Sequence, residues 1–317
     1  MVRAVALVVV ASSIGSARGA DSVAAVLPPA SRVFGPAAVV AKIRTGSRPC
    51  LAAQIRAAVW VSNFGSGDLV RINPATNRFV GRRIRVGSQP CGLAYAARNV
   101  WVDSFGTNRI ERLDLRKARV TKRIRVGARP WDVHYAAGAL WVANSLDGTV
   151  SRIDPRTGRI VATIRTGESP ANITFAFGSL WVGSTTGLKV FRIDPATNAV
   201  AAVEAGGEEP TSVEAAADAA WIANRASNTV TRIDPASGRI LATVPVGANP
   251  SWLAAASDGT IFVPNNGDDT VSRIDPSTNS VIETMQAGPG PIVIRTAFGD
   301  LWLTHLRGRE VWRIHAG

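Results

Sequence analysis

The sequence repeats itself about every forty residues, and few folds accommodate such a period. A glycine with a proline three residues on recurs seven times, from Gly46 and Pro49 to Gly288 and Pro291. An arginine followed by Ile or Leu keeps the same step, from Arg71 to Arg313. An aromatic residue followed by Val, Ile or Leu opens a similar segment at steps of 40 or 41 residues: Trp60, Trp101, Trp141, Trp181, Trp221, Phe262 and Trp302. The agreement of three markers indicates seven structural units of one kind.

Each unit contains four short runs of strand length. In the third unit they read "PWDVHYAA", "ALWVANS", "TVSRID" and "RIVATIRTG", all rich in Val, Ile, Thr or aromatic residues. The last two runs are joined by "DPRTG", in which Pro155 presets a turn and Gly158 tolerates a left-handed conformation. Each unit is therefore predicted to be a four-stranded antiparallel blade, with the repeated tryptophan in the core between blades rather than in an aromatic binding box.

The two ends of the repeat region complement each other. The last unit stops at "VWRIHAG", residues 311–317, without a fourth strand, whereas "AVVAKIRTG", residues 38–46, precedes the first unit as a spare strand. An N-terminal strand that completes the last blade would leave no open sheet edge. We therefore predict an all-β protein, a seven-bladed β-propeller over residues 38–317, in one domain and as a monomer.

The N-terminus has the pattern of a secretory signal. Residues 1–19 contain Arg3, an apolar run and small residues at the end, and that run is too short to span a membrane. A Pro/Ala-rich lead follows over residues 20–37. This pattern predicts a secreted or extracytoplasmic protein without a transmembrane segment; the alternative is a frayed N-terminal helix.

The segments "WVAN", "GTVSRIDP" and "TGRIVATI" make the chain resemble the YVTN-type propeller repeat of exported microbial proteins. Its "GxxPxxI" and "LW" patterns resemble more weakly the streptogramin (virginiamycin B) lyases, which implies catalysis by His and Glu residues with a divalent cation at the channel mouth. Here the residue that ends the "LWVxN" segment is Asn or Ser in six units and His305 in the last, never Glu. His134 and Glu214 are the nearest stand-ins for those residues.

The residues after the repeated proline are expected to form the innermost strand of each blade and to line a central channel. The third residue after the proline is apolar in every unit, so the second and fourth face the other way, and these are polar in units three to five. Asp132, His134 and Glu214 are weak catalytic candidates, because a His between carboxylates can transfer protons. A wet channel without function is the alternative. The predicted ligand-binding residues are Trp131, Asp132, His134, Asn172, Glu214, Trp252 and Arg295.

The two cysteines, Cys50 and Cys91, follow the repeated proline in adjacent units. They could form a disulfide in an exported protein, or remain buried thiols; a catalytic cysteine is a more remote alternative. The sequence contains no HExxH, GxSxG or CxxC motif, and the Asx-rich residues 265–269 lack a full calcium motif. No metal site and no cofactor are therefore predicted, apart from a divalent cation if the protein is lyase-like.

Composition and charge restrict the possible functions but do not identify one. Hydrophobic residues make up 46% and charged residues 19%, which suits a folded protein, and the formal net charge is +13. The leading hypothesis is an exported binding or scaffold module for a small molecule, glycan or protein at the channel face. The alternatives are a lyase or hydrolase of the streptogramin-lyase kind, and Arg-mediated binding of nucleic acid or another polyanion. The recurrence of arginine once per unit favours a structural role for much of this charge.

Overall fold

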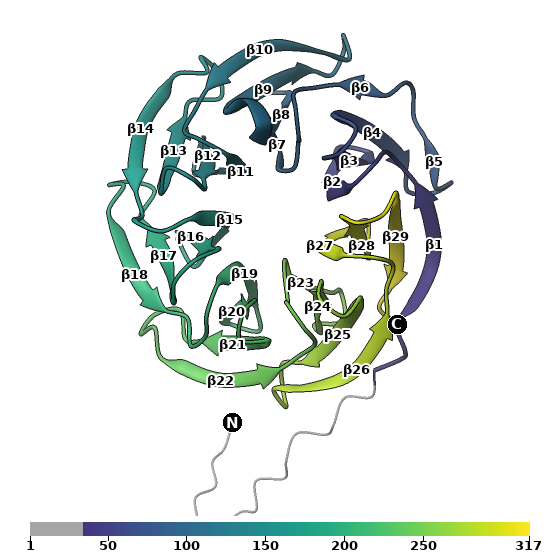
Figure 1. The fold of residues 1–317 in the computed structure, drawn as a ribbon, viewed down its shortest axis with the longest axis vertical. Coiled ribbons are helices and arrows are strands. Elements are labelled where there is room, and N and C mark those ends of the chain that lie inside the picture. Colours follow the sequence, from purple (N-terminus) through teal and green to yellow (C-terminus); the bar gives the residue numbers. More distant parts are fainter. Residues whose placement is uncertain (1–33) are drawn as a thin grey trace, which may run out of the picture. The chain divides into compact units, whose positions relative to one another are not determined.

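The computed structural model describes residues 34–317, which form seven antiparallel β-sheets around a central axis (Figure 1). The predicted seven-bladed β-propeller is confirmed. The predicted signal segment and most of the lead lie outside the described residues. No helix within residues 34–317 is long and apolar enough to cross a membrane.

Blades 1 to 3 follow one another along the chain, each starting at its innermost strand. Blade 1 consists of β2 (Pro49–Ile55), β3 (Ala58–Asn63), β4 (Asp68–Asn73) and two short pieces, β5 (Arg78–Phe79) and β6 (Ile84–Arg85). Blade 2 consists of β7 (Leu93–Ala96), β8 (Asn99–Ser104), the 3₁₀ turn η1 (Phe105–Thr107), β9 (Arg109–Asp114) and β10 (Arg119–Arg125). Blade 3 consists of β11 (Pro130–Ala136), β12 (Ala139–Asn144), β13 (Thr149–Ile153) and β14 (Ile160–Arg165).

Blades 4 to 7 complete the ring. Blade 4 consists of β15 (Pro170–Ala176), β16 (Ser179–Ser184), β17 (Lys189–Ile193) and β18 (Val200–Glu204). Blade 5 consists of β19 (Pro210–Ala216), β20 (Ala219–Asn224), β21 (Thr229–Ile233) and β22 (Ile240–Pro245). Blade 6 consists of β23 (Ala254–Ala255), β24 (Ile261–Asn265), β25 (Thr270–Asp275) and β26 (Ser280–Gln286). Blade 7 consists of β27 (Pro291–Ala297), β28 (Asp300–His305), β29 (Glu310–His315) and β1 (Ala38–Arg44).

The hairpin between the third and fourth strands of a blade uses the predicted turn residues. In blade 3, Asp154 accepts a hydrogen bond from the backbone N–H two residues on, at 2.8 Å, which closes an Asx turn. Gly158 then adopts a φ of 71°, in the left-handed region that glycine tolerates best. Asparagine takes the same conformation in other blades: Asn77 (φ 57°), Asn198 (φ 62°) and Asn279 (φ 53°).

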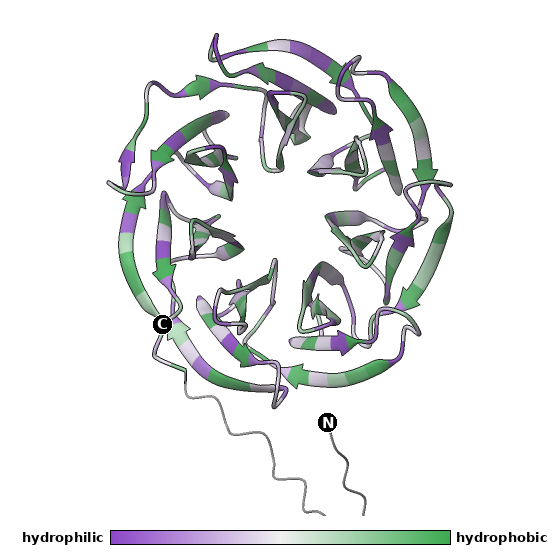
Figure 2. Cartoon of the chain, turned by 180° about the vertical axis from the view of Figure 1, so that it is seen from behind, coloured by the Kyte–Doolittle hydropathy of each residue, from purple (hydrophilic) through white to green (hydrophobic). Residues whose placement is uncertain are grey.

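The core lies between the blades. The repeated tryptophans are 0–3% exposed, so the predicted core role is confirmed. Side chains of β1 and β10 alternate between solvent and the blade interior. Figure 2 shows hydrophilic and hydrophobic residues mixed along the outer strands of the ring. Each blade thus packs an apolar face on its neighbour.

The repeated arginine links one blade to the next. In blade 3, the guanidinium of Arg152 lies 5.0 Å from the ring centroid of Trp141 and donates to Asn198 Oδ1 of blade 4 at 2.9 Å. In blade 5, Arg232 donates in the same way to Asn279 Oδ1 of blade 6 at 3.0 Å. A cation–π contact contributes about 0.5–1 kcal/mol at such partly exposed sites. These arginines therefore recur for a structural reason, as expected.

The ring closes in blade 7, where β1 pairs antiparallel with β29. The predicted closure by an N-terminal strand is thus present. Blade 7 has no hairpin for the arginine of blade 6 to contact, because its last two strands come from opposite ends of the chain. Arg273 instead donates to the carbonyls of Gly35 and Ala316, both at 2.6 Å, and forms ion pairs with Asp258 and with Glu283, the latter at 3.1 Å.

Candidate functional site at the channel mouth

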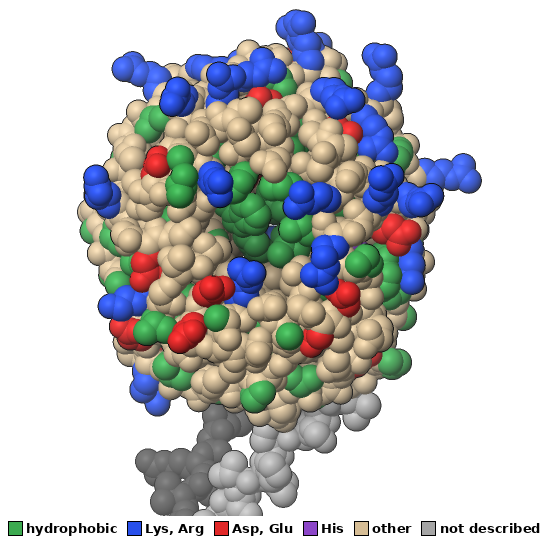
Figure 3. Space-filling model, viewed as in Figure 1, with side chains coloured by type: hydrophobic (Ala, Val, Ile, Leu, Met, Phe, Trp, Pro, Cys, Tyr) green, Lys and Arg blue, Asp and Glu red, His purple; other side chains and the backbone are tan. Residues whose placement is uncertain are grey.

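Two sets of loops meet on one face of the ring. The loops that carry the repeated glycine and proline accept backbone hydrogen bonds from the loops between the second and third strands, for example from Phe64 N to Arg48 O at 2.8 Å and from Ser145 N to Arg129 O at 3.1 Å. Figure 3 shows this organisation as a face with an apolar hollow at its centre and Lys and Arg side chains around it. We call this hollow the channel mouth.

Four aromatic side chains fill the centre of the mouth. Trp131 at the start of β11 lies 5.2 Å from Phe105, 6.0 Å from Phe64 and 6.1 Å from Trp252, measured between ring centroids. Phe64 and Phe105 lie 5.9 Å apart. Trp131 and Trp252 come from blades 3 and 6, so they meet across the channel. The four rings, here called the aromatic plug, give the mouth an apolar floor.

A pocket of about 320 Å³ lies beside the plug. This volume is at the lower end of the range for small-molecule sites. Its floor is apolar, and two guanidinium groups and several hydroxyl groups stand at its edge. The lining residues are Phe105, Arg129, Trp131, Ser145, Leu146, Ser169, Thr185 and Arg225.

Two arginines at the mouth stack on the plug without forming an ion pair. The guanidinium of Arg129 lies 5.4 Å from the centroid of Phe105, and that of Arg48 lies 5.0 Å from Phe64. Neither is paired with any carboxylate of the described chain, whereas Arg225 is paired with Glu209 at 3.4 Å. The Arg129 and Arg48 guanidiniums are therefore available to an anion.

One residue of the pocket lining has a polar side-chain atom without a protein partner. The indole Nε1 of Trp131 is buried and donates no hydrogen bond to any described residue. An unpaired buried donor costs about 1–3 kcal/mol. The same holds for the indole Nε1 of Trp252.

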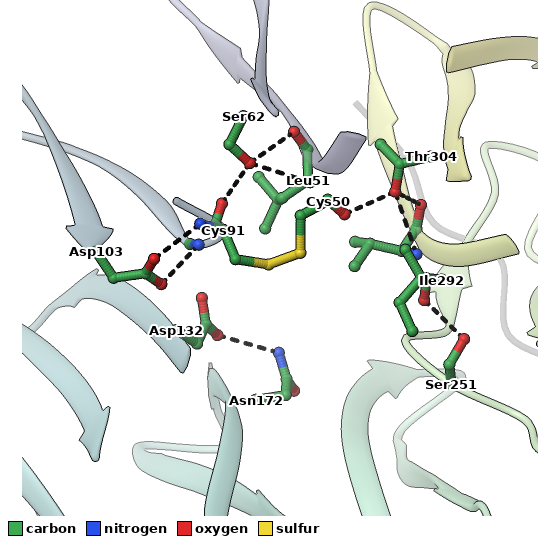
Figure 4. Close-up of a disulfide and its surroundings, with 12 residues drawn as sticks. Cys50, Leu51, Ser62, Cys91, Asp103, Asp132, Asn172, Ser251, Ile292 and Thr304 are labelled. Atoms are coloured by element: carbon green, nitrogen blue, oxygen red, sulfur yellow. Dashed lines mark hydrogen bonds between the residues drawn. A yellow bond between two sulfur atoms is a disulfide. The ribbon is translucent and has the colours of Figure 1, made fainter. Parts of the chain in front are cut away.

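Deeper along the inner strands, polar side chains tie neighbouring blades together (Figure 4). Asp132 Oδ2 accepts hydrogen bonds from Ile173 N at 2.9 Å and from Asn172 Nδ2 at 3.4 Å, and Asn172 Oδ1 accepts one from Val213 N at 3.2 Å. The oxygen atoms of Asp132 and Asn172 that sequence reasoning assigned to a ligand thus bind backbone N–H groups of the next blade. Hydroxyl groups make equivalent links elsewhere in the ring: Ser62 to Cys91 O, Ser251 to Ile292 O and Thr304 to Cys50 O.

A second polar group of the channel combines blades 3, 5 and 7. Glu214 lies 3.8 Å from Arg295 in an ion pair. Burial raises the pKa of Glu214, although Arg295 and the backbone N–H of Ala255 act in the opposite direction. Burial, followed by the charge of Arg295, lowers the pKa of His134 to about 4. His134 is therefore a neutral imidazole at pH 7, near enough to the Arg295 guanidinium to be affected by its charge.

The predicted site residues thus fall into two levels. Trp131 lines the pocket, and Trp252 packs against Trp131. The other predicted residues lie further along the channel: Asp132, His134, Asn172, Glu214 and Arg295. The pocket arginines, Arg129 and Arg225, were not among the predicted ligand-binding residues, because they stand in loops that vary between units. The signal was present in Phe64 and Phe105, which occupy matching loops of adjacent units.

The cysteines lie beside the plug. Cys50 and Cys91 form a disulfide with a Cα–Cα distance of 5.1 Å, within the range that a disulfide requires. It joins the inner chain of blade 1 to that of blade 2 (Figure 4). The buried carboxylate of Asp103 holds the second of these segments by accepting hydrogen bonds from Cys91 N at 2.8 Å and Gly92 N at 2.7 Å. Burial raises the pKa of Asp103 well above its usual value.

His305 occupies the place of the asparagine in other units. Its Nε2 accepts a hydrogen bond from Gly288 N at 3.1 Å, as Asn63 Oδ1 does from Gly46 N at 2.9 Å in blade 1. Its Nδ1 lies 3.1 Å from the carbonyl oxygen of Glu310. With both ring nitrogens in use and its pKa lowered mainly by burial, His305 has a structural role in the loop.

The described residues contain no group of three His, Cys, Asp or Glu side chains placed to hold a metal ion. In the Asx-rich residues 265–269, Asp268 Oδ2 accepts a hydrogen bond from Ala248 N at 2.8 Å, and Asp269 pairs with Arg307 at 2.5 Å. These carboxylates therefore stabilise the loops in which they lie.

Comparison with known proteins supports the class of fold, a seven-bladed β-propeller. No family model and no curated protein matches the sequence, so the resemblance to the YVTN-type repeat has no such support. Among solved structures, a streptogramin B lyase aligns with a TM-score of 0.76 and 16% identity, over 87% of this chain and 97% of that chain.

Two further structures show the same likeness. The virginiamycin B lyase of Staphylococcus aureus, as its selenomethionine form, has a TM-score of 0.76 and 15% identity, over 87% of this chain and 98% of its own. The WD40 β-propeller domain of Doa1 has a TM-score of 0.74 and 12% identity, over 89% and 97%. At such identities the likeness concerns the fold alone, which serves both enzymes and binding scaffolds.

Proposed function

We propose that this protein is a binding module that takes a small ligand in the mouth pocket, and that the ligand combines an apolar or aromatic body with an anionic group. The observation that carries the proposal is the Arg129 guanidinium, stacked on Phe105 at the pocket edge and paired with no described carboxylate. An arginine in that position favours a carboxylate, sulfonate or phosphate group.

The ligand body would lie on the plug. The exposed Leu146 side chain and the partly buried rings of Phe105 and Trp131 offer apolar surface. Burying about 100 Å² of ligand surface there would contribute about 2–3 kcal/mol. Apolar contact and a charged hydrogen bond together would give a Kd on the order of 0.1–1 mM.

The test uses two fluorescent probes of similar shape. Anilinonaphthalene sulfonate carries an anionic group on an aromatic body, and N-phenyl-1-naphthylamine lacks that group. We expect the sulfonate to bind the folded protein at one site and Arg129→Gln to weaken it about tenfold, while the uncharged probe is unaffected. Trp131→Ala should weaken both, and Arg159→Gln, an exposed outer arginine, should change neither. Equal sulfonate affinity in wild type and Arg129→Gln would contradict the proposal.

A lyase or hydrolase of the streptogramin-lyase kind is the second candidate. The observation that favours it is the neutral His134, which is affected by the charge of Arg295, the ion-pair partner of Glu214, in a fold shared with that lyase. In that case His134 would take a proton from the substrate and Arg295 would stabilise developing negative charge. Turnover that survives His134→Ala would rule out this site for the reaction.

We also propose, from the N-terminal pattern, that the protein is exported. Expression of the full chain should then yield an extracytoplasmic product whose N-terminal sequence begins at Ala20. A product that retains Met1 inside the cell would contradict this.

A further inference from the structure

The positive charge is concentrated in one sector of the ring. Residues 78–125 contain 13 Lys and Arg against 3 Asp and Glu, a net charge of +10 out of +13 for the whole chain. Figure 3 shows these cations crowded along the margin where Figure 1 places β5, β6 and β10, while acidic side chains lie mainly across the ring. The charge is therefore not spread evenly over the repeat.

The cations of this sector differ from the repeated structural arginines, because the corresponding outer strands of other blades carry few cations. β10 reads "RVTKRIR", whereas the corresponding β14, β18, β22 and β26 read "IVATIR", "VAAVE", "ILATVP" and "SVIETMQ". All these strands occupy the same place in their blades, so the fold does not require cations there. The excess on blades 1 and 2 needs another explanation.

Most of these cations point to solvent without an acidic partner. Within the sector, only Arg83 and Arg123 form ion pairs with described carboxylates, to Asp68 at 3.4 Å and Glu111 at 3.0 Å. Eight exposed arginines of the sector have no such pair, and the six that lie on the outer strands or next to them define what we call the basic rim: Arg78, Arg82, Arg85, Arg116, Arg119 and Arg125. Like charges gathered in one sector repel each other, and an anionic surface would relieve that repulsion.

The basic rim also has an apolar tip. In blade 1 the outer strand is broken into β5 and β6, and between them Gly81 has a φ of 71°. Phe79 and Val80 precede this break and are 43% and 40% exposed, with Arg78 and Arg82 on either side. Exposed aliphatic residues also occur on other outer strands, but none of those strands lies within such a charged sector.

We propose that the basic rim docks the propeller edge-on to an anionic phospholipid bilayer, with Phe79 and Val80 entering the interface. Lipid headgroups offer phosphates that guanidinium groups bind bidentately, and the layer beneath them accepts apolar side chains. A duplex nucleic acid offers phosphates as well, but no apolar layer for the tip. A bilayer surface is broad and can contact cations on two blades at once, whereas a rod-shaped nucleic-acid duplex contacts fewer of them.

The test measures co-sedimentation of the full chain with two kinds of vesicle, phosphatidylcholine alone and phosphatidylcholine with phosphatidylglycerol. Binding is expected only to the second, falling steeply between 50 and 500 mM NaCl. The combined change Arg78→Gln, Arg82→Gln and Arg85→Gln should weaken it about a hundredfold, since each cation near the surface contributes about 1 kcal/mol. Phe79→Ser with Val80→Ser should lower the fraction bound that persists at high salt.

The matched control removes three exposed arginines from other outer strands by the changes Arg159→Gln, Arg165→Gln and Arg239→Gln. This control should keep vesicle binding within a factor of about three. Equal losses in both triple variants would overturn the proposal, because net charge and not the rim would then be responsible. Binding of a DNA duplex, but not of vesicles, through the rim residues would overturn it in favour of nucleic acid.

Discussion

Replacing Arg273 with glutamine should open the ring at its seam. This side chain is 2% exposed and connects blade 6 to both ends of the propeller, through the carbonyls of Gly35 and Ala316. Its charge is balanced by Asp258 and Glu283. Glutamine keeps the length approximately but removes the charge and most of the donors. Two carboxylates and two carbonyls would then lose their partner at once.

The expected loss follows from the burial of these groups. Removing one member of a buried ion pair typically costs about 3–5 kcal/mol. Asp258 and Glu283 are 14% and 27% exposed, so water can partly replace the guanidinium, which places the loss near the lower limit, at about 3 kcal/mol. For a domain of this size, 1 kcal/mol corresponds to about 2–3 °C in Tm. The variant should therefore melt about 6–9 °C below the wild type.

Calorimetry and hydrogen exchange would check the size and the place of the effect. The control is Arg232→Gln in blade 5, which loses a stacking contact with Trp221 and hydrogen bonds to the next turn but leaves no carboxylate unpaired, so it should cost about 1–2 kcal/mol. Amides of β1 and β29 should exchange faster in Arg273→Gln alone. Equal melting points for the two variants, or unchanged exchange in β1, would refute the reasoning.

Three further predictions concern single groups. Cys50→Ser with Cys91→Ser should cost about 4 kcal/mol in urea unfolding, because the disulfide closes a loop of 41 residues; a loss below 1 kcal/mol would contradict this. His134 binds its proton less readily in the folded than in the unfolded state, where its pKa is about 6.5. Lowering the pH from 6.5 towards 4 should therefore destabilise the wild type relative to His134→Gln, by up to about 3 kcal/mol. If the difference in free energy of unfolding between the two proteins did not change with pH, a neutral buried imidazole would be excluded. His305→Asn should melt within about 3 °C of the wild type, since asparagine fills this place elsewhere, whereas His305→Ala should lose the bond to Gly288 and about 1–3 kcal/mol.

The candidate site was only partly predictable from the sequence. The alternation after the repeated proline placed His134, Glu214 and Arg295 on one face, and in the structure Arg295 pairs with Glu214 and affects His134, because equivalent positions of a propeller all face one channel. The same reasoning gave Asp132 to a ligand, although its oxygen binds Ile173 N of the next blade. Hydrogen bonds between blades join residues about forty positions apart, and the local periodicity of a sequence does not predict such bonds.

The sequence predicted both Trp131 and Trp252 at the site, but it did not predict their contact, for a geometric reason. Trp131 is the first residue after its proline and Trp252 the second, so they do not hold equivalent places in the repeat. A register shift after Pro130 in β11 and the bridge of Trp252 to Val293 reorient the two side chains. Their contact at 6.1 Å depends on how far the ring brings blades 3 and 6 together.

The sequence by itself determined the seven blades, the turns and the closing strand, because each depends on local signals: the alternation and the left-handed turn residue that recur in the units, and a spare N-terminal strand that matches the strand missing from the last unit. The tertiary structure decided which loops share the mouth, that Arg129 stacks on Phe105 without an acidic partner, and that the cations of blades 1 and 2 form one rim. These are properties of neighbours in space. In a ring of similar blades, the repeated residues determine the fold, whereas residues that depart from the repeat form a site only where the ring places them side by side.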